Sequence, residues 1–189
     1  CNIVIGLPGE TKDDLEEGRQ FLRTTNANWY GIYCANPLVG SEMFDICIEN
    51  NFLEENWIGS DYKQAVISTD QWDSTHIAKF AYKLNLELNL LENSDYRLGN
   101  YTLALEGFER VIRAKSDHAI GHLMAARCHA LMGNQAKAEE HFAQVAEIWI
   151  KNPYWQDQME HFEIDLEKIL TSHTELQNGD EVPRHFTSY

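Results

Sequence analysis

The sequence predicts a mainly α-helical chain in which a short β/α segment comes first and an array of paired helices follows. Two observations lead to this expectation. Residues 2–10 read NIVIGLPGE, an apolar run that enters a Gly-Pro-Gly turn. Between residues 99 and 145, five residue identities recur at a spacing of 34 residues. A fixed period of this length is typical of stacked helical repeats.

The first segment is expected to form a strand, a turn and a helix. Residues 3–5 are all β-branched, which favours a strand buried on both faces. Thr11 stands three residues before Asp14, the spacing of an N-cap with an acidic partner, so a helix is expected over residues 12–24. A second strand-like run covers residues 29–35. Because two parallel strands cannot bury their own faces, we expect this part to be a fragment of a larger barrel or sheet.

The segments IVIGLPGET and WYGIYCANPLVGSEMFD resemble the last third of a radical S-adenosylmethionine enzyme, of the branch that often has a cobalamin-binding domain ahead of its barrel. In that family a strand of pattern GxIxGxxGE passes its backbone against the adenine of S-adenosylmethionine, and the next strand closes the other side. Asn2 stands where the pattern has its first glycine. The cofactor-binding residues that the resemblance implies are Val4, Gly6, Gly9, Glu10, Tyr33, Cys34, Ala35 and Asn36.

The family's chemistry needs a CxxxCxxC loop whose thiolates hold a 4Fe-4S cluster. The cysteines of this chain, Cys1, Cys34, Cys47 and Cys128, do not have that spacing. The resemblance therefore implies a parent enzyme that uses S-adenosylmethionine, a 4Fe-4S cluster and, in the cobalamin branch, cobalamin. The chain alone is expected to bind none of these cofactors and to be non-catalytic.

The 34-residue period is that of the tetratricopeptide repeat, in which a small residue stands at the turn, another stands where two helices cross, and a large apolar residue fills the space between helix pairs. The paired identities are Gly99 and Gly133, Asn100 and Asn134, Ala104 and Ala138, Phe108 and Phe142, and Val111 and Val145.

Four parts are expected along the chain. Residues 1–58 form the C-terminal fragment of the barrel, and 59–83 form a connector in which Ser74 or Thr75 caps a helix that runs on into the first repeat. Residues 84–171 form the repeats, whose last helix is expected to end near Asn152-Pro153, and a final capping helix over 154–170. Residues 172–189 are polar and are expected to form a flexible tail.

A peptide groove would be lined by the first helix of each repeat. The candidate groove residues are Asn89, Asn93, Arg97, Leu123 and Arg127. The Lys and Asn pattern of a carboxylate clamp is absent, because residue 89 is Asn at the position where that pattern has Lys. Arg97 and Arg127 either meet an acidic ligand group or sit in surface ion pairs. The expected partner is a protein or peptide, or the missing barrel of the parent.

Four residues of the repeats raise the alternatives of a metal site and simple packing. His118, His122, Cys128 and His129 are close enough in sequence for zinc to be considered. The repeat alignment puts His122 and His129 at packing positions, and a further CxxC or HxxH element is absent. We therefore expect packing and no metal.

The composition excludes two classes of partner. With 15 Lys and Arg against 30 Asp and Glu, the net charge of -15 disfavours nucleic acid, and no apolar run approaches the ~20 residues of a membrane span. Unpatterned cysteines fit a reducing compartment, so a cytoplasmic protein is expected.

Two functional hypotheses follow. The chain is the C-terminal portion of a radical S-adenosylmethionine enzyme, with the repeats as its recognition module. The alternative is a stand-alone tetratricopeptide-repeat scaffold for protein binding, with no enzymatic role.

Overall fold

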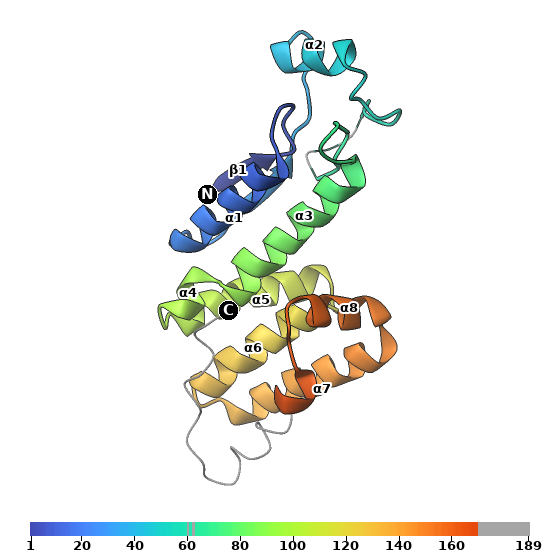
Figure 1. Ribbon diagram of the computed structural model, residues 1–189. Helices are drawn as coiled ribbons and strands as arrows, with labels where there is room; N and C mark the ends of the chain where they lie inside the picture. The colour runs from blue at the N-terminus through green and yellow to red at the C-terminus, as the bar shows by residue number, and fades with distance from the viewer. Residues whose placement is uncertain (60, 62, 170–189) are drawn as a thin grey trace. The chain divides into compact units, whose positions relative to one another are not determined.

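A computed structural model describes residues 1–59, 61 and 63–169, which are mainly helical (Figure 1). The expected tail over 172–189 lies outside the described residues. The chain divides into two compact units, Cys1–Ala104 and Leu105 onward. The elements in order are β1 (Asn2–Ile5), α1 (Lys12–Thr24), β2 (Gly31–Cys34), α2 (Glu42–Glu49), α3 (Ser74–Leu86), the π-helix η1 (Glu87–Leu91), α4 (Ser94–Arg97), α5 (Tyr101–Ala114), α6 (Ala119–Leu131), α7 (Gln135–Lys151) and α8 (Pro153–His161).

The first unit is built on β1 and β2, which pair in parallel. One face of this pair, with Ile5 and Cys34, packs into a core that includes Leu15 of α1 and Ile77 of α3. On the opposite face Val4 is 50% exposed. The prediction that this strand is buried on both faces is therefore wrong for the described residues, because α1 and α3 cover only one side of the sheet.

Helix α1 has the predicted bounds and the predicted cap. The Thr11 hydroxyl accepts a hydrogen bond from the backbone N–H of Asp14, and the Asp14 carboxylate accepts one from the N–H of Thr11. This reciprocal capping box satisfies two of the donors that the start of a helix leaves unpaired. The helix lies beside β1 and α3 in Figure 1.

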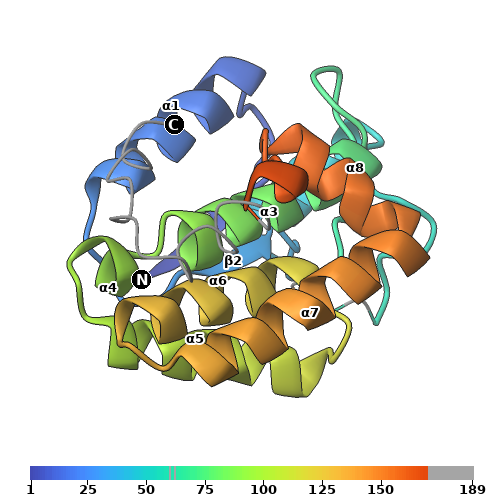
Figure 2. The same cartoon turned by 90° about the horizontal axis from the view of Figure 1, so that it is seen from below.

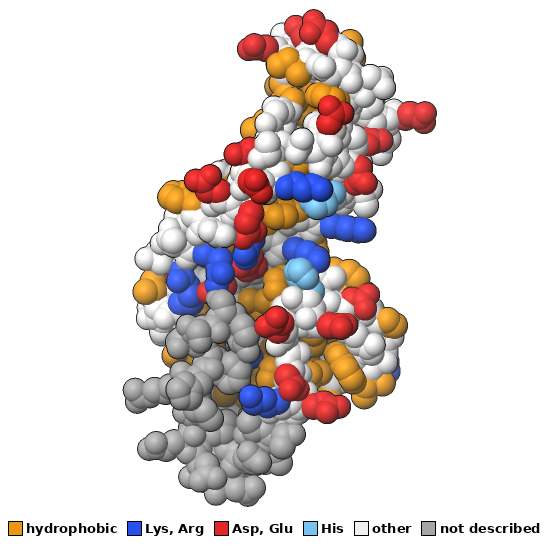
Figure 3. Space-filling view, viewed as in Figure 1, with side chains coloured by type: hydrophobic (Ala, Val, Ile, Leu, Met, Phe, Trp, Pro, Cys, Tyr) orange, Lys and Arg blue, Asp and Glu red, His pale blue; other side chains and the backbone are white. Residues whose placement is uncertain are grey.

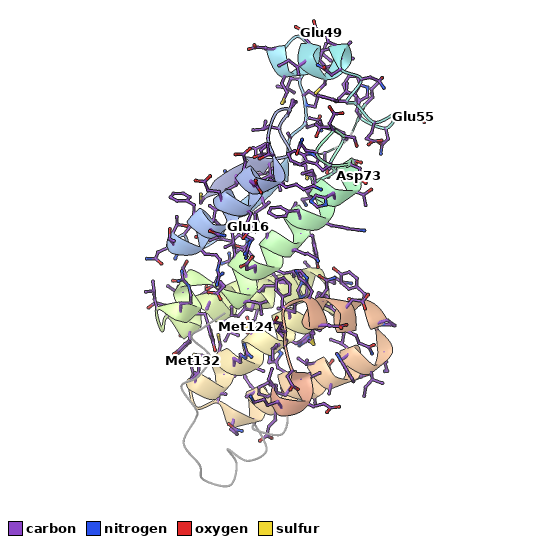
Figure 4. All side chains as sticks on the ribbon, in the orientation of Figure 1. Glu16, Glu49, Glu55, Asp73, Met124 and Met132 are labelled. Atoms are coloured by element: carbon purple, nitrogen blue, oxygen red, sulfur yellow. The ribbon has the colours of Figure 1, made fainter. Side chains whose placement is uncertain are left out.

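Helix α3 begins one residue away from the expected cap, since Asp73 rather than Ser74 or Thr75 accepts the N–H of His76. Figure 4 labels Asp73 at this helix start. As expected, the helix continues beyond residue 83: α3 runs to Leu86, and the π-helix η1 follows it. Asn93 then caps the short helix α4 by accepting the N–H of Tyr96. The sequence predicted one helix that runs from Ser74 or Thr75 into the first repeat. The structure divides this segment into three elements, α3, η1 and α4.

The buried amide of Asn89 lies within η1 and bonds to the backbone of Tyr30 in the first unit. Its Oδ1 accepts the N–H of Tyr30 at 2.7 Å, and its Nδ2 donates to the carbonyl of Tyr30 at 2.8 Å. Asn89 thereby satisfies both backbone groups of the residue that leads into β2. Nearby, Arg19 of α1 bonds to Glu16, labelled in Figure 4, and to Glu87 of η1 at N–O distances of 2.7 and 2.6 Å.

In the second unit α6 packs along α7 and against α8 (Figure 2). The turn before α7 has the same geometry as the turn before α5, 34 residues earlier. Gly99 and Gly133 have φ values of 81° and 77°. The backbone N–H of Asn100 donates to the carbonyl of Asp95, and the backbone N–H of Asn134 donates to the carbonyl of His129, both at 2.8 Å. Each turn therefore ends a helix with a left-handed glycine and a six-to-one hydrogen bond.

Two expected boundaries at the end of the second unit have different outcomes. Helix α7 ends at Lys151, next to the Asn152-Pro153 pair that predicted its end. The prediction of one helix over 154–170 is wrong, because α8 stops at His161. Glu163 adopts a φ of 54°, and the N–H of Ile164 closes the turn on the carbonyl of Met159. The boundary between the compact units lies at the start of α5, whereas the sequence starts the repeat array at residue 84; that domain assignment stays a prediction.

Candidate functional site

The turn after β1 is held by its own acidic residue. Gly6 and Gly9 have φ values of 79° and 90°, a region that favours glycine. The Glu10 carboxylate accepts the N–H of Gly6 at 2.6 Å and that of Leu7 at 3.0 Å. Glu10 therefore fixes the shape of the turn, and its Oε2 atom is engaged by the backbone.

The two glycines meet different surroundings. A Cβ on Gly6 would lie 2.8 Å from Cγ2 of Ile77, a side chain of α3 that is 1% exposed. A Cβ on Gly9 would meet nothing within 4 Å. Gly6 thus allows the turn to approach α3, and Gly9 leaves open space above the turn.

The carboxyl end of β2 lies beside this turn. Val4 pairs in register with Tyr33, and the N–H of Ala35 bonds to the carbonyl of Ile5 at 2.8 Å. The structure therefore gathers the eight residues of the implied cofactor site around one edge of the sheet. Ala35 is buried, and Asn36 is partly buried.

The side chains of these residues divide between the two faces of the sheet. Val4 and Tyr33 belong to the exposed face, whereas the Cys34 side chain is buried in the core. Burial, with a smaller effect of Asp61, raises the pKa of the Cys34 thiol above its ordinary value. Only the backbone of Cys34 is therefore available to a ligand at the sheet edge.

This arrangement fits part of a cofactor site. A glycine turn and an exposed strand face can receive a flat ring, because backbone and small side chains allow close approach. An iron–sulfur cluster does not fit the cysteines, since Cys34, Cys47 and Cys128 are buried thiols and only Cys1 is exposed. Among the described residues, no group of three His, Cys, Asp or Glu side chains is arranged to hold a metal.

The five groove residues are placed differently from one another. Asn89 and Asn93 are buried. The Asn89 side chain accepts the N–H of Tyr30, and the Asn93 side chain accepts the N–H of Tyr96 and donates to the carbonyl of Asn89. Arg97 is exposed and donates to the carbonyls of Glu92 and Thr25 and to the side chain of Asn26. Leu123 is buried in the second unit, where Arg127 contacts Met124. A peptide groove formed by these residues stays a prediction.

The histidines of α6 serve its structure. His118 is the N-cap, and its Nδ1 accepts the N–H of Gly121 at 3.0 Å. Burial is the main cause that lowers its pKa to about 4. His122 and His129 both contact His141 of α7, a residue that no sequence motif singled out. Cys128 is buried, which raises its pKa to about 12.

Charge is uneven over the first unit. Acidic side chains gather over α2 in Figure 3, where Glu42, Asp45 and Glu49 are exposed. This surface disfavours the phosphates of a nucleic acid. No helix in residues 1–59, 61 and 63–169 is both long enough and apolar enough to cross a membrane.

Comparison with curated proteins gives a partial match. The chain is 28% identical over 103 residues to cytidylyl-2-hydroxyethylphosphonate methyltransferase of Streptomyces wedmorensis, a match that covers 50% of this chain and 19% of that protein. No family model matches the sequence. No solved structure matches the chain. The chain thus spans about a fifth of the length of the curated relative it matches, and it is a partial homologue of a methyltransferase.

Proposed function

We propose that this chain is the C-terminal portion of a radical S-adenosylmethionine methyltransferase, and that β1 and β2 are the last strands of its barrel. The observation that carries the proposal is the exposed face and glycine turn at the carboxyl edge of the parallel pair. The partial homology to a methyltransferase supports the same reading. Ligands of parallel α/β sheets bind beyond the carboxyl ends of the strands.

In this proposal the chain supplies one wall of the cofactor site. Val4 and Tyr33 face the adenine, and the backbone of the Gly6–Glu10 turn and of residues 34–36 borders it. Glu10 keeps the turn rigid through its bonds to Gly6 and Leu7. When bound, S-adenosylmethionine and a 4Fe-4S cluster supply the radical or methyl chemistry. The cluster, and cobalamin where it is used, belong to the rest of the parent.

The helices after residue 84 are proposed to be tetratricopeptide repeats that recognise a protein, a peptide or the parent's own barrel. The recurring glycine turns at residues 99 and 133 support this proposal. Ala104 and Ala138, one in each turn's following helix, are both almost fully buried, as close helix crossings require. The proposed location is the cytoplasm.

Binding of S-adenosylmethionine tests the cofactor wall. We expect the isolated chain to bind it more weakly than about 1 mM, because half a site lacks most of its contacts. In the full-length parent, Val4→Lys should weaken binding at least tenfold by placing a charge against the adenine. Phe21→Lys is the matched control, since Phe21 is a 66% exposed side chain on α1. Micromolar binding by the isolated chain, or equal effects of the two variants, would contradict the proposal.

The alternative, a stand-alone repeat scaffold, is favoured by the second unit, in which α6, α7 and α8 pack without any strand among the described residues. The coding sequence upstream of Cys1 distinguishes the two functions. A CxxxCxxC motif within one domain's length, on the order of 150 residues, supports the enzyme. A start codon with no such motif before Cys1 supports the scaffold.

A further inference from the structure

Three histidines meet between α6 and α7. The Nδ1 atoms of His122 and His141 are 2.9 Å apart, although these residues are separated by 19 positions in the chain. The ring of His129 stacks on the ring of His141, with centroids 5.5 Å apart and planes inclined by 16°. His129 is 3% exposed, and its Nδ1 has no hydrogen-bond partner. The cluster is therefore part of the helix interface.

The contacts fix where the protons lie. The Nε2 of His122 is 3.0 Å from the carbonyl of Ser116, and a carbonyl only accepts, so this nitrogen carries the proton. Neutral His122 then accepts at Nδ1, and His141 must donate to it from its own Nδ1. One further proton can be shared by this pair without breaking the Nδ1–Nδ1 bond. A second proton would put two N–H groups against each other.

The charged groups around the cluster come from three helices. Positive charge on His122 or His129 disfavours protonation of His141, and Lys137 of α7 disfavours charge on His129. Glu109 of α5 and Glu140 of α7 oppose this effect for His129 and His141. Helix α8 meets α6 through Trp155, whose ring lies 4.4 Å from that of His118. Glu109 and Glu140 thus make the first protonation of the cluster less unfavourable. They do not remove the clash between two N–H groups that a second proton would cause.

We propose that His122, His129 and His141 form an acid-sensitive latch that holds α6 against α7 only while at most one of them is protonated. Burial, with the charges of His122 and His129, lowers the pKa of His141 to about 4. A histidine whose pKa is lower in the folded state than in the unfolded state binds more protons when unfolded. The contribution of neutral His141 to the free energy of unfolding is therefore fully present above about pH 6.5, and it is lost as the pH falls toward about 4.

Hydrogen exchange on the full chain tests the latch. Protection factors of α6 and α7 amides, corrected for intrinsic exchange, should fall at least tenfold between about pH 7.5 and about pH 5. His141→Gln removes the titrating ring and should reduce this pH effect several-fold. His161→Gln, which removes an exposed histidine of the same unit, should leave it unchanged. Equal pH dependence in the wild type and His141→Gln would overturn the proposal.

A titration of the unmodified chain covers the case in which His141→Gln does not fold. The imidazole carbon signals of His129 and His141 are followed by NMR, and both rings should titrate below the ordinary histidine value of about 6.5, His141 near pH 4. Loss of protection in α6 and α7 should accompany their protonation. Titration of both rings near their ordinary value, with α6 and α7 still protected, would refute the latch.

Discussion

Replacing Gly6 by alanine tests how the sheet edge is built. The added Cβ would lie 2.8 Å from Cγ2 of Ile77, which is a stiff β-branched side chain in the core of the first unit. An alanine at the φ of 79° also destabilises the folded state by roughly 1–2 kcal/mol, because the left-handed backbone conformation strains a residue with a Cβ. Overpacking a core contact costs about 1–3 kcal/mol. Gly6→Ala should therefore lower the free energy of unfolding of the first unit by roughly 2–5 kcal/mol.

Gly9→Ala is the matched control, because it has a similar φ of 90° but nothing within 4 Å of the added Cβ. Gly9→Ala should lower the free energy of unfolding only through the left-handed strain of the new alanine, by roughly 1–2 kcal/mol. Urea unfolding followed by circular dichroism measures both variants. The difference between them isolates the steric effect, and equal losses would show that the turn does not approach α3 as described.

A double-mutant cycle sharpens this test. Ile77→Ala removes the Cγ2 atom that the new Cβ would meet, so Gly6→Ala should be less costly in that background than in the wild type. The coupling between the two positions should be roughly 1–3 kcal/mol, within the range seen for residues in contact. Additive losses would refute the steric explanation even if Gly6→Ala is strongly destabilising.

Two further substitutions test the packing of each unit. Asn89→Ala should destabilise the first unit by about 2–5 kcal/mol, because the N–H and carbonyl of Tyr30 would both stay buried without their partner; a loss below about 1 kcal/mol in urea unfolding would show that this contact is dispensable. Ala138→Leu should cost about 1–3 kcal/mol by overpacking, whereas Ala136→Leu at an exposed position of the same helix should change thermal unfolding little. Equal thermal stability of the two leucine variants would argue against the buried position of Ala138.

Much of the local structure was predictable from sequence because its causes lie within one helical turn. Thr11 and Asp14 specify the start of α1 by themselves, and Asn152-Pro153 marks the end of α7. Motif positions indicated which residues to expect at the sheet edge, and their part in cofactor binding stays a prediction. The break between η1 and α4, and the turn at Glu163, carried no comparably clear local signal.

The sequence alone determined the mainly helical class, the strand and turn at residues 2–10, and the two glycine turns 34 residues apart, because each depends on side chains that are neighbours in the chain. Only the tertiary structure decided that Val4 is exposed, that Asn89 pairs with Tyr30, and that His122 meets His141. These features arise from contacts between residues that are far apart in the chain, and their burial and hydrogen bonding have no local signature.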